Sequence, residues 1–136
     1  MARRVVPNKI TRHSASVALE LLENGVLCCA VAGPITSATL LHFRAQTLAR
    51  YAGSFSAMVV DYRRASVAMD GGTLTALGAA ADALPMPLAF VVTDADVDMF
   101  MEHAARMALR RMSRRVFTES AAAVLWASQA NLRAAE

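Results

Sequence analysis

The segment that most constrains the fold runs from residue 58 to residue 77, MVVDYRRASVAMDGGTLTAL. One apolar stretch ends at Asp61, a second ends at Asp70, and a Gly-Gly-Thr turn then opens a helical pattern. This order predicts a strand over Ala57 to Asp61, followed by an acidic residue and a turn at the start of a helix. Because the first N–H groups of a helix lack internal acceptors, such a turn suits an anion or an acidic partner surface.

A β-hairpin is predicted upstream of this segment. Residues 16–22, SVALELL, alternate as a half-buried strand does, and the run VLCCAVAG follows after Asn24-Gly25. Asn-Gly between two such runs is a strong hairpin signal, because both residues tolerate positive φ. The second run is apolar on both faces, which is typical of a central strand, and Gly33-Pro34 is expected to end it.

The rest of the chain alternates between helical and extended patterns, so we predict an α/β fold. Its sheet is mixed and mostly parallel, with about four or five strands, an opening β-hairpin and helices packed on it. Residues 15–132 are expected to form a single domain, and residues 1–14 a flexible N-terminal arm or an edge extension. The expected elements after the hairpin are a helix from Thr36 to Ala52, the strand Ala57–Asp61, a helix to Ala83, the strand Leu88–Val92, a long helix after Thr93, the strand Arg115–Phe117 and a last helix to Ala130.

Composition excludes several classes of protein. The 136 residues fit one domain, and no apolar run approaches the roughly 18 residues of a membrane helix. The basic N-terminus lacks the apolar stretch of a secretion signal, so we expect a cytoplasmic protein without a membrane span. Cys28 and Cys29 are adjacent on a predicted strand and point to opposite faces, which favours reduced, small apolar residues over a disulfide.

The charge pattern favours a protein partner over nucleic acid. The net charge is +3, but aromatic residues make up only 6% of the chain and do not alternate with the central arginines. Stacking aromatics and lysines are typical of nucleic-acid surfaces, so no nucleic-acid binding is expected. The arginines from Arg106 to Arg115 are interpreted first as a solvated helix face and second as a surface for an acidic protein.

No pattern indicates a catalytic, metal or cofactor site. Asp61 and Asp70 are expected at the edge of the sheet where ligands of open α/β sheets bind, but no nucleophile or histidine accompanies them. The chain is therefore interpreted as non-enzymatic, with no cofactor and no metal. The other acidic and histidine residues lack the spacing of metal ligands: His13, His42, His103, Asp94, Asp96 and Asp98.

The turn at residues 70–73 resembles the signature of the STAS domain, the module shared by sulfate transporters and anti-sigma-factor antagonists. In that family a strand leads to Asp-Ser-Ser-Gly-Leu-Gly and then a helix. Asp70 matches the Asp, Gly71 and Gly72 stand where the two serines would be, and Thr73 replaces the Gly. The order of elements over roughly residues 16–130 is similar to STAS and SpoIIAA-like proteins. The second serine is the phosphoacceptor in the bacterial antagonists, and Gly72 cannot accept phosphate.

The resemblance implies a bacterial regulatory module that works by protein–protein binding, with an anti-sigma factor or kinase as partner. The expected partner-binding residues are the turn Asp70, Gly71, Gly72 and Thr73, flanked by Arg63 and Arg64. Thr73 and Ser66 are the alternative phosphosites. A second hypothesis is a STAS-like domain that binds a small apolar ligand or a lipid under the methionine-rich helix near Met99. Homodimerisation is left open.

Overall fold

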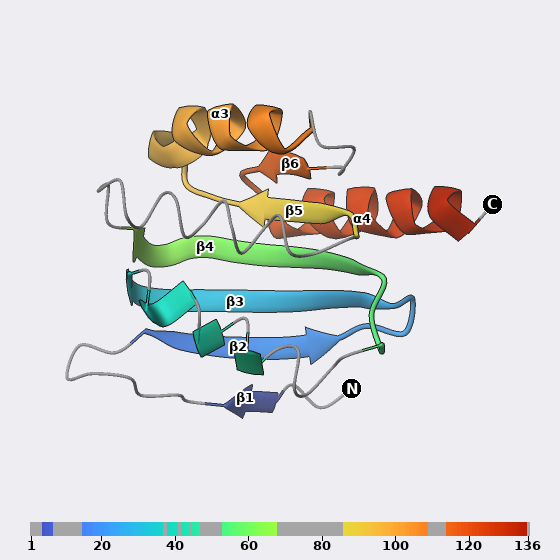
Figure 1. The fold of residues 1–136 in the computed structure, drawn as a ribbon, viewed down its shortest axis with the longest axis horizontal. Helices are drawn as coiled ribbons and strands as arrows, with labels where there is room; N and C mark the ends of the chain where they lie inside the picture. The colour runs from blue at the N-terminus through green and yellow to red at the C-terminus, as the bar shows by residue number, and fades with distance from the viewer. Residues whose placement is uncertain are drawn as a thin grey trace.

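The structure of the chain is a computed structural model that describes residues 4–6, 15–36, 38–40, 42–43, 45–46, 53–67, 86–108 and 114–135. Six strands of these residues form one sheet, in which each strand neighbours the next one along the chain (Figure 1). They are β1 (Arg4–Val6), β2 (Ser16–Leu21), β3 (Val26–Ile35), β4 (Ala57–Val67), β5 (Leu88–Val91) and β6 (Arg114–Phe117).

The sheet is mixed and mostly parallel, which confirms the predicted fold class. β1, β2 and β3 pair antiparallel, whereas β3, β4, β5 and β6 pair parallel. The described strands exceed the four or five expected, because Arg4–Val6 adds an edge strand to β2 within the segment 1–14.

The predicted hairpin is confirmed between β2 and β3. Gly25 has φ +83°, the left-handed backbone that a tight turn requires and that glycine adopts without a steric cost. The Asn24 side-chain carbonyl accepts a hydrogen bond from the Val26 N–H at 3.2 Å. The Asn24 amide also donates to Ser128 Oγ at 2.6 Å, which ties the turn to the last helix.

Two strands, β3 and β4, continue past the ends that the sequence predicts. β3 does not stop at Gly33-Pro34, because Gly33, Pro34 and Ile35 pair with Ala65, Ser66 and Val67. Likewise β4 does not end at Asp61 but runs to Val67. Gly33 has φ +91°, which only glycine adopts readily, and Pro34 is exposed on the strand. Long-range pairing between the two strands therefore outweighs the local breaking signals.

Helices cover the two faces of the sheet. One face packs against helical residues 38–40, 42–43 and 45–46 and against α3 (Val97–Ala108), which follows the short 3-10 helix η1 (Asp94–Asp96). The opposite face packs against α4 (Ser120–Ala135). No helix in the described part of the chain is both long and apolar enough to cross a membrane.

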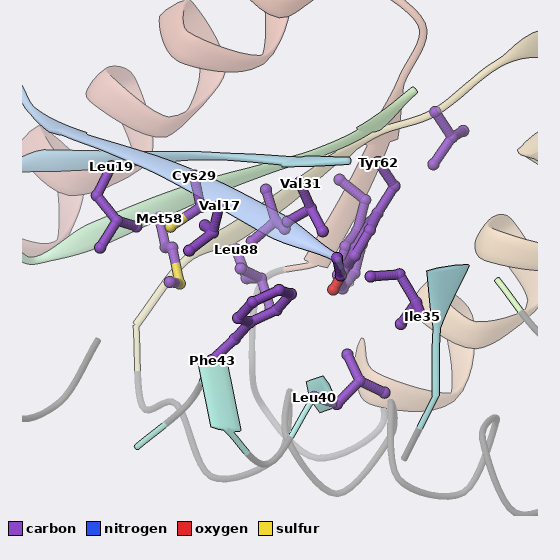
Figure 2. Close-up of a cluster of buried hydrophobic side chains, with 14 of the residues drawn as sticks. Val17, Leu19, Cys29, Val31, Ile35, Leu40, Phe43, Met58, Tyr62 and Leu88 are labelled. Atoms are coloured by element: carbon purple, nitrogen blue, oxygen red, sulfur yellow. The ribbon is translucent and has the colours of Figure 1, made fainter. Parts of the chain in front are cut away.

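The larger core lies on the face that carries α3. Leu40 and Phe43 approach the sheet side chains Val17, Leu19, Cys29, Val31, Met58 and Leu88, with Ile35 and Tyr62 beside them (Figure 2). Tyr62 and Phe90 pack on Phe100 of α3, with both ring centroids 5.5 Å from the Phe100 ring. The smaller core, on the α4 face, consists mainly of valine and alanine: Val26, Ala57, Val59, Ala89, Val91, Ala123 and Ala127.

Candidate docking surface

The far half of β4 extends beyond the neighbouring strand β5. Pairing between β4 and β5 ends at Asp61 and Val91, whereas β4 continues to Val67 with β3 as its paired neighbour. Figure 1 shows that β3 and β4 both continue past the end of β5. Arg63, Arg64 and Ser66 are exposed on this extension. The structure therefore brings these three predicted residues together on one stretch of strand.

A β-bulge sets the direction of the arginines. Ala30 pairs with Asp61 and Ala32 pairs with Arg64, so Tyr62 and Arg63 together lie opposite the single residue Val31. A bulge bends the strand and re-aims the side chains that follow it. Tyr62 remains in the core, and Arg64 is placed beside Ala32 on the α4 side of the sheet.

Arg63 forms a bidentate ion pair with Asp61. The Arg63 guanidinium donates from Nη2 to Asp61 Oδ2 at 2.7 Å, and from Nε to Oδ1 at 3.0 Å and to Oδ2 at 3.2 Å. The Arg63 backbone N–H donates to Oδ1 at 3.0 Å. Partial burial raises the pKa of Asp61, but the hydrogen bonds and charge of Arg63, with the charge of Arg64, outweigh it, so the pKa lies below its ordinary value. The hydrogen bond to Asp61 raises the pKa of Arg63.

Of the two neighbouring arginines, Arg64 is the one whose side chain remains available to a partner. Its side chain is exposed, and within the described residues no hydrogen bond or ion pair joins it to another group. Arg63, in contrast, is held by Asp61. A guanidinium without an internal acceptor offers several N–H donors to a carboxylate or phosphate from outside.

The predicted turn residues Asp70, Gly71, Gly72 and Thr73 lie outside the described residues. Asp61 was expected at the end of its strand, and that prediction is wrong, since β4 continues for six residues beyond it. Asp61 does pair with Val91, the last residue of β5, so it lies where the neighbouring strand ends. Its carboxylate is already bound by Arg63.

Sequence reasoning missed a small cavity on the α4 side of the sheet. It has a volume of about 160 Å³, and Glu20, Cys28, Ala30 and Asp61 line it together with Ser120 of α4. The sequence pattern indicated only that Glu20 belongs to an alternating strand. The same alternation places Glu20 on the face opposite Val17 and Leu19, and this signal could have predicted a carboxylate on the α4 side of the sheet.

The two cysteines point to opposite faces, as the strand pattern predicts. Cys29 is buried in the larger core, whereas half-buried Cys28 packs at the border of the smaller one. Burial raises the pKa of the Cys29 thiol far above its ordinary value, so this thiol stays protonated and unreactive.

A second cavity of about 290 Å³ lies where α3 and α4 begin, and its lining includes Val97, Val116, Thr118 and Glu119. In the methionine-rich helix α3, Phe100 is buried in the core and Met101 is exposed. Among the described residues, no three His, Cys, Asp or Glu side chains gather in a group that could hold a metal ion.

Comparison with solved structures identifies the class of fold. The chain superposes on an anti-sigma factor antagonist from Mycobacterium paratuberculosis with a TM-score of 0.62 and 17% identity, over 86% of this chain and 97% of that chain. An uncharacterized protein with a SpoIIAA-like fold from Shewanella loihica gives a TM-score of 0.55 and 14% identity, over 88% of this chain and 98% of that one. No protein-family model and no curated protein sequence matches the chain. The chain has the STAS/SpoIIAA-like fold.

Proposed function

We propose that this chain is a non-enzymatic regulatory module that acts by binding another protein, with an anti-sigma factor or a kinase as the partner class. The binding surface in this proposal consists of the turn Asp70–Thr73, the helix that follows it, and the β4 extension with Arg63 and Arg64. One observation carries the proposal. The β4 extension presents the exposed guanidinium of Arg64, which has no acceptor among the described residues. In the sequence, Arg64 precedes the 70–73 segment by six residues.

Fold similarity supports the protein-binding part of the proposal. One structure with this fold is an anti-sigma factor antagonist, and its superposition covers nearly that whole chain. A protein-binding role also agrees with the arrangement of charge on β4. Asp61 holds Arg63 in place, so the local surface is preorganised while Arg64 stays available for an acidic partner.

Phosphorylation at the family's usual position is not expected, because Gly72 has no hydroxyl group. Regulation, where it occurs, is proposed at Ser66 or Thr73. Ser66 is exposed on β4 two residues after Arg64. A phosphate placed there would add up to about two negative charges beside that guanidinium and compete with an acidic partner.

Two measurements test the proposal. Incubation with candidate kinases and ATP, followed by mass spectrometry, is expected to show phosphate at Ser66 or Thr73 only. Titration calorimetry with candidate anti-sigma factors is expected to show about tenfold weaker binding for Arg64→Glu, which corresponds to about 1.4 kcal/mol. Arg115→Glu, an exposed arginine on β6, is the matched control and should bind as the original chain does. Equal losses in both variants would contradict a role for the β4 extension.

The alternative function is a STAS-like domain that binds a small apolar ligand or a lipid. The 160 Å³ cavity and the 290 Å³ cavity are each lined by a carboxylate side chain, which does not favour an apolar ligand in either of them. Native mass spectrometry after gentle purification separates the two functions, because a hydrophobic ligand that co-purifies with the chain would support the alternative.

A further inference from the structure

On the α4 side, no described helix covers the whole width of the sheet. α4 packs on β3, β4, β5 and β6, and no described helix lies over β1 and β2 on that side. Neighbouring strands are about 4.8 Å apart and a helix is about 10 Å wide, so a six-stranded sheet has room for two helices on each face. α4 occupies one of these two places.

The part of this face that no described helix covers has a floor of small side chains. Ala18 of β2 pairs with Ala30 of β3, and Ala32 pairs with Arg64 of β4. All three alanines are half-buried. We call this surface, Ala18, Ala30 and Ala32 with Glu20 and Arg64 at its ends, the open strip. Alanine side chains allow a helix backbone to approach a sheet closely, as they do where Ala123 and Ala127 of α4 meet the sheet.

Opposite charges mark the two ends of the open strip. Glu20 lies at the level of Cys28 and Arg64 at the level of Ala32, four residues along β3 or about 13 Å. Glu20 lines the 160 Å³ cavity together with Asp61, and no hydrogen bond or ion pair joins Glu20 to another described residue. Arg64 is likewise without an acceptor among the described residues. For a helix that runs parallel to the strands, this offset along the strand direction corresponds to slightly more than two turns, and Glu20 and Arg64 lie on the strands to either side of β3.

From this arrangement we infer that the open strip binds an amphipathic helix of a partner protein, lying beside α4. This helix carries a basic residue that enters the Glu20 cavity and an acidic residue about two turns away that meets Arg64. Small or apolar residues between them pack on the three alanines. The inference rests on the proposed function, because it requires that the chain acts through a protein partner, and it names the chemistry of that partner's contact.

Charge argues against a second copy of this chain as the occupant. α4 is the described helix nearest the open strip, and over residues 120–130, the part of α4 whose side-chain burial is described, the exposed positions are Ala121, Ala122, Leu125 and Gln129. None of these side chains carries a charge that could meet Glu20 or Arg64. A partner helix with one basic and one acidic residue satisfies both ends.

Site-specific photocrosslinking in the cells that naturally produce the protein tests the inference. The full chain carries p-benzoylphenylalanine at Ser16, which pairs with Ala32 at the edge of the open strip, or at Gln129, on the exposed side of α4, as the control position. The crosslinked peptide is then sequenced by mass spectrometry. Ser16 is expected to capture a helical partner segment with a basic and an acidic residue about two turns apart, whereas Gln129 is expected not to capture it.

Charge reversal makes the test specific. Glu20→Lys is expected to lower the crosslinking yield at Ser16 several-fold, whereas Glu23→Lys, the same change at an exposed turn residue three positions away, leaves it unchanged. Capture of this chain itself, or an equal yield in both variants, would overturn the inference. A third crosslinker position at Ser66 separates the two proposals. Capture at Ser66 without capture at Ser16 removes only the open-strip helix, whereas no capture at either position removes the proposed function as well.

Discussion

Asp61 joins the structural and functional roles of β4. Its carboxylate accepts both the side chain and the backbone N–H of Arg63, at the bulge where β4 passes the end of β5. A carboxylate that accepts two kinds of donor from one residue fixes that residue's backbone and side chain together. Asp61 therefore orients the extension on which Arg64 and Ser66 lie.

Replacement of Asp61 by Asn is expected to change how stability depends on pH. The pKa of Asp61 is lowered in the folded chain, so its contribution to stability is present above the unfolded value of 3.8 and is lost as the pH falls through the lower folded value. Urea unfolding from about pH 7 to about pH 3 should show that Asp61→Asn lowers the free energy of unfolding by less than about 1 kcal/mol near neutrality. This loss of stability should become smaller in acid. Asp94→Asn, at an exposed residue, is the control. A difference that stays constant across this range would contradict the prediction.

The sequence predicts the elements better than their ends. The Asn24-Gly25 hairpin is local chemistry, and it forms where the pattern places it. Gly33-Pro34 and the polar residues after Asp61 are equally strong local signals for the end of a strand, yet β3 and β4 continue past them. The two strands sustain each other through pairing between residues more than thirty positions apart, which no local pattern encodes.

The candidate site was predicted only in part for the same reason. Arg63, Arg64 and Ser66 were identified from their neighbourhood in the sequence, and the structure places them together on β4. The Glu20 cavity combines residues from β2, β3, β4 and α4. Such a surface depends on strand register and on where α4 packs. Register is set by pairing across the whole sheet, which residue patterns along one strand do not determine.

Alanines position α4 against the sheet, and their size is expected to limit substitution. Ala127 has no exposed surface and packs in the smaller core with Val59 and Val91. Ala127→Leu adds three carbon atoms to a filled contact, so it should destabilise the chain by about 1–3 kcal/mol in urea unfolding. Ala121→Leu, the same change on the exposed side of α4, should stay within about 0.5 kcal/mol. Similar losses in both variants would show that helix propensity, rather than packing, controls α4.

At the scale of the whole molecule, one sheet separates two cores that share their strands. Val60 and Tyr62 of β4 face the larger core, while Val59 of the same strand faces the smaller one. Phe100 lies in the larger core, and the single tryptophan, Trp126, packs on the smaller one against Phe117 at a ring-centroid distance of 6.0 Å. Because the same strands form both cores, unfolding of one core would expose the side chains of the other. The two cores should therefore unfold in one cooperative step.

Phe100→Ala tests this coupling across the sheet. Removal of the buried ring should cost about 3–5 kcal/mol, because it leaves a cavity beside Tyr62 and Phe90. In urea, the transition reported by Trp126 fluorescence should shift by as much as the transition reported by far-UV circular dichroism, although Trp126 lies on the other face. Met101→Ala, at the exposed neighbouring position on α3, should move neither transition appreciably. An unchanged Trp126 transition in Phe100→Ala would mean that the α4 face folds independently, and a partner bound on that face could then not sense changes in the larger core.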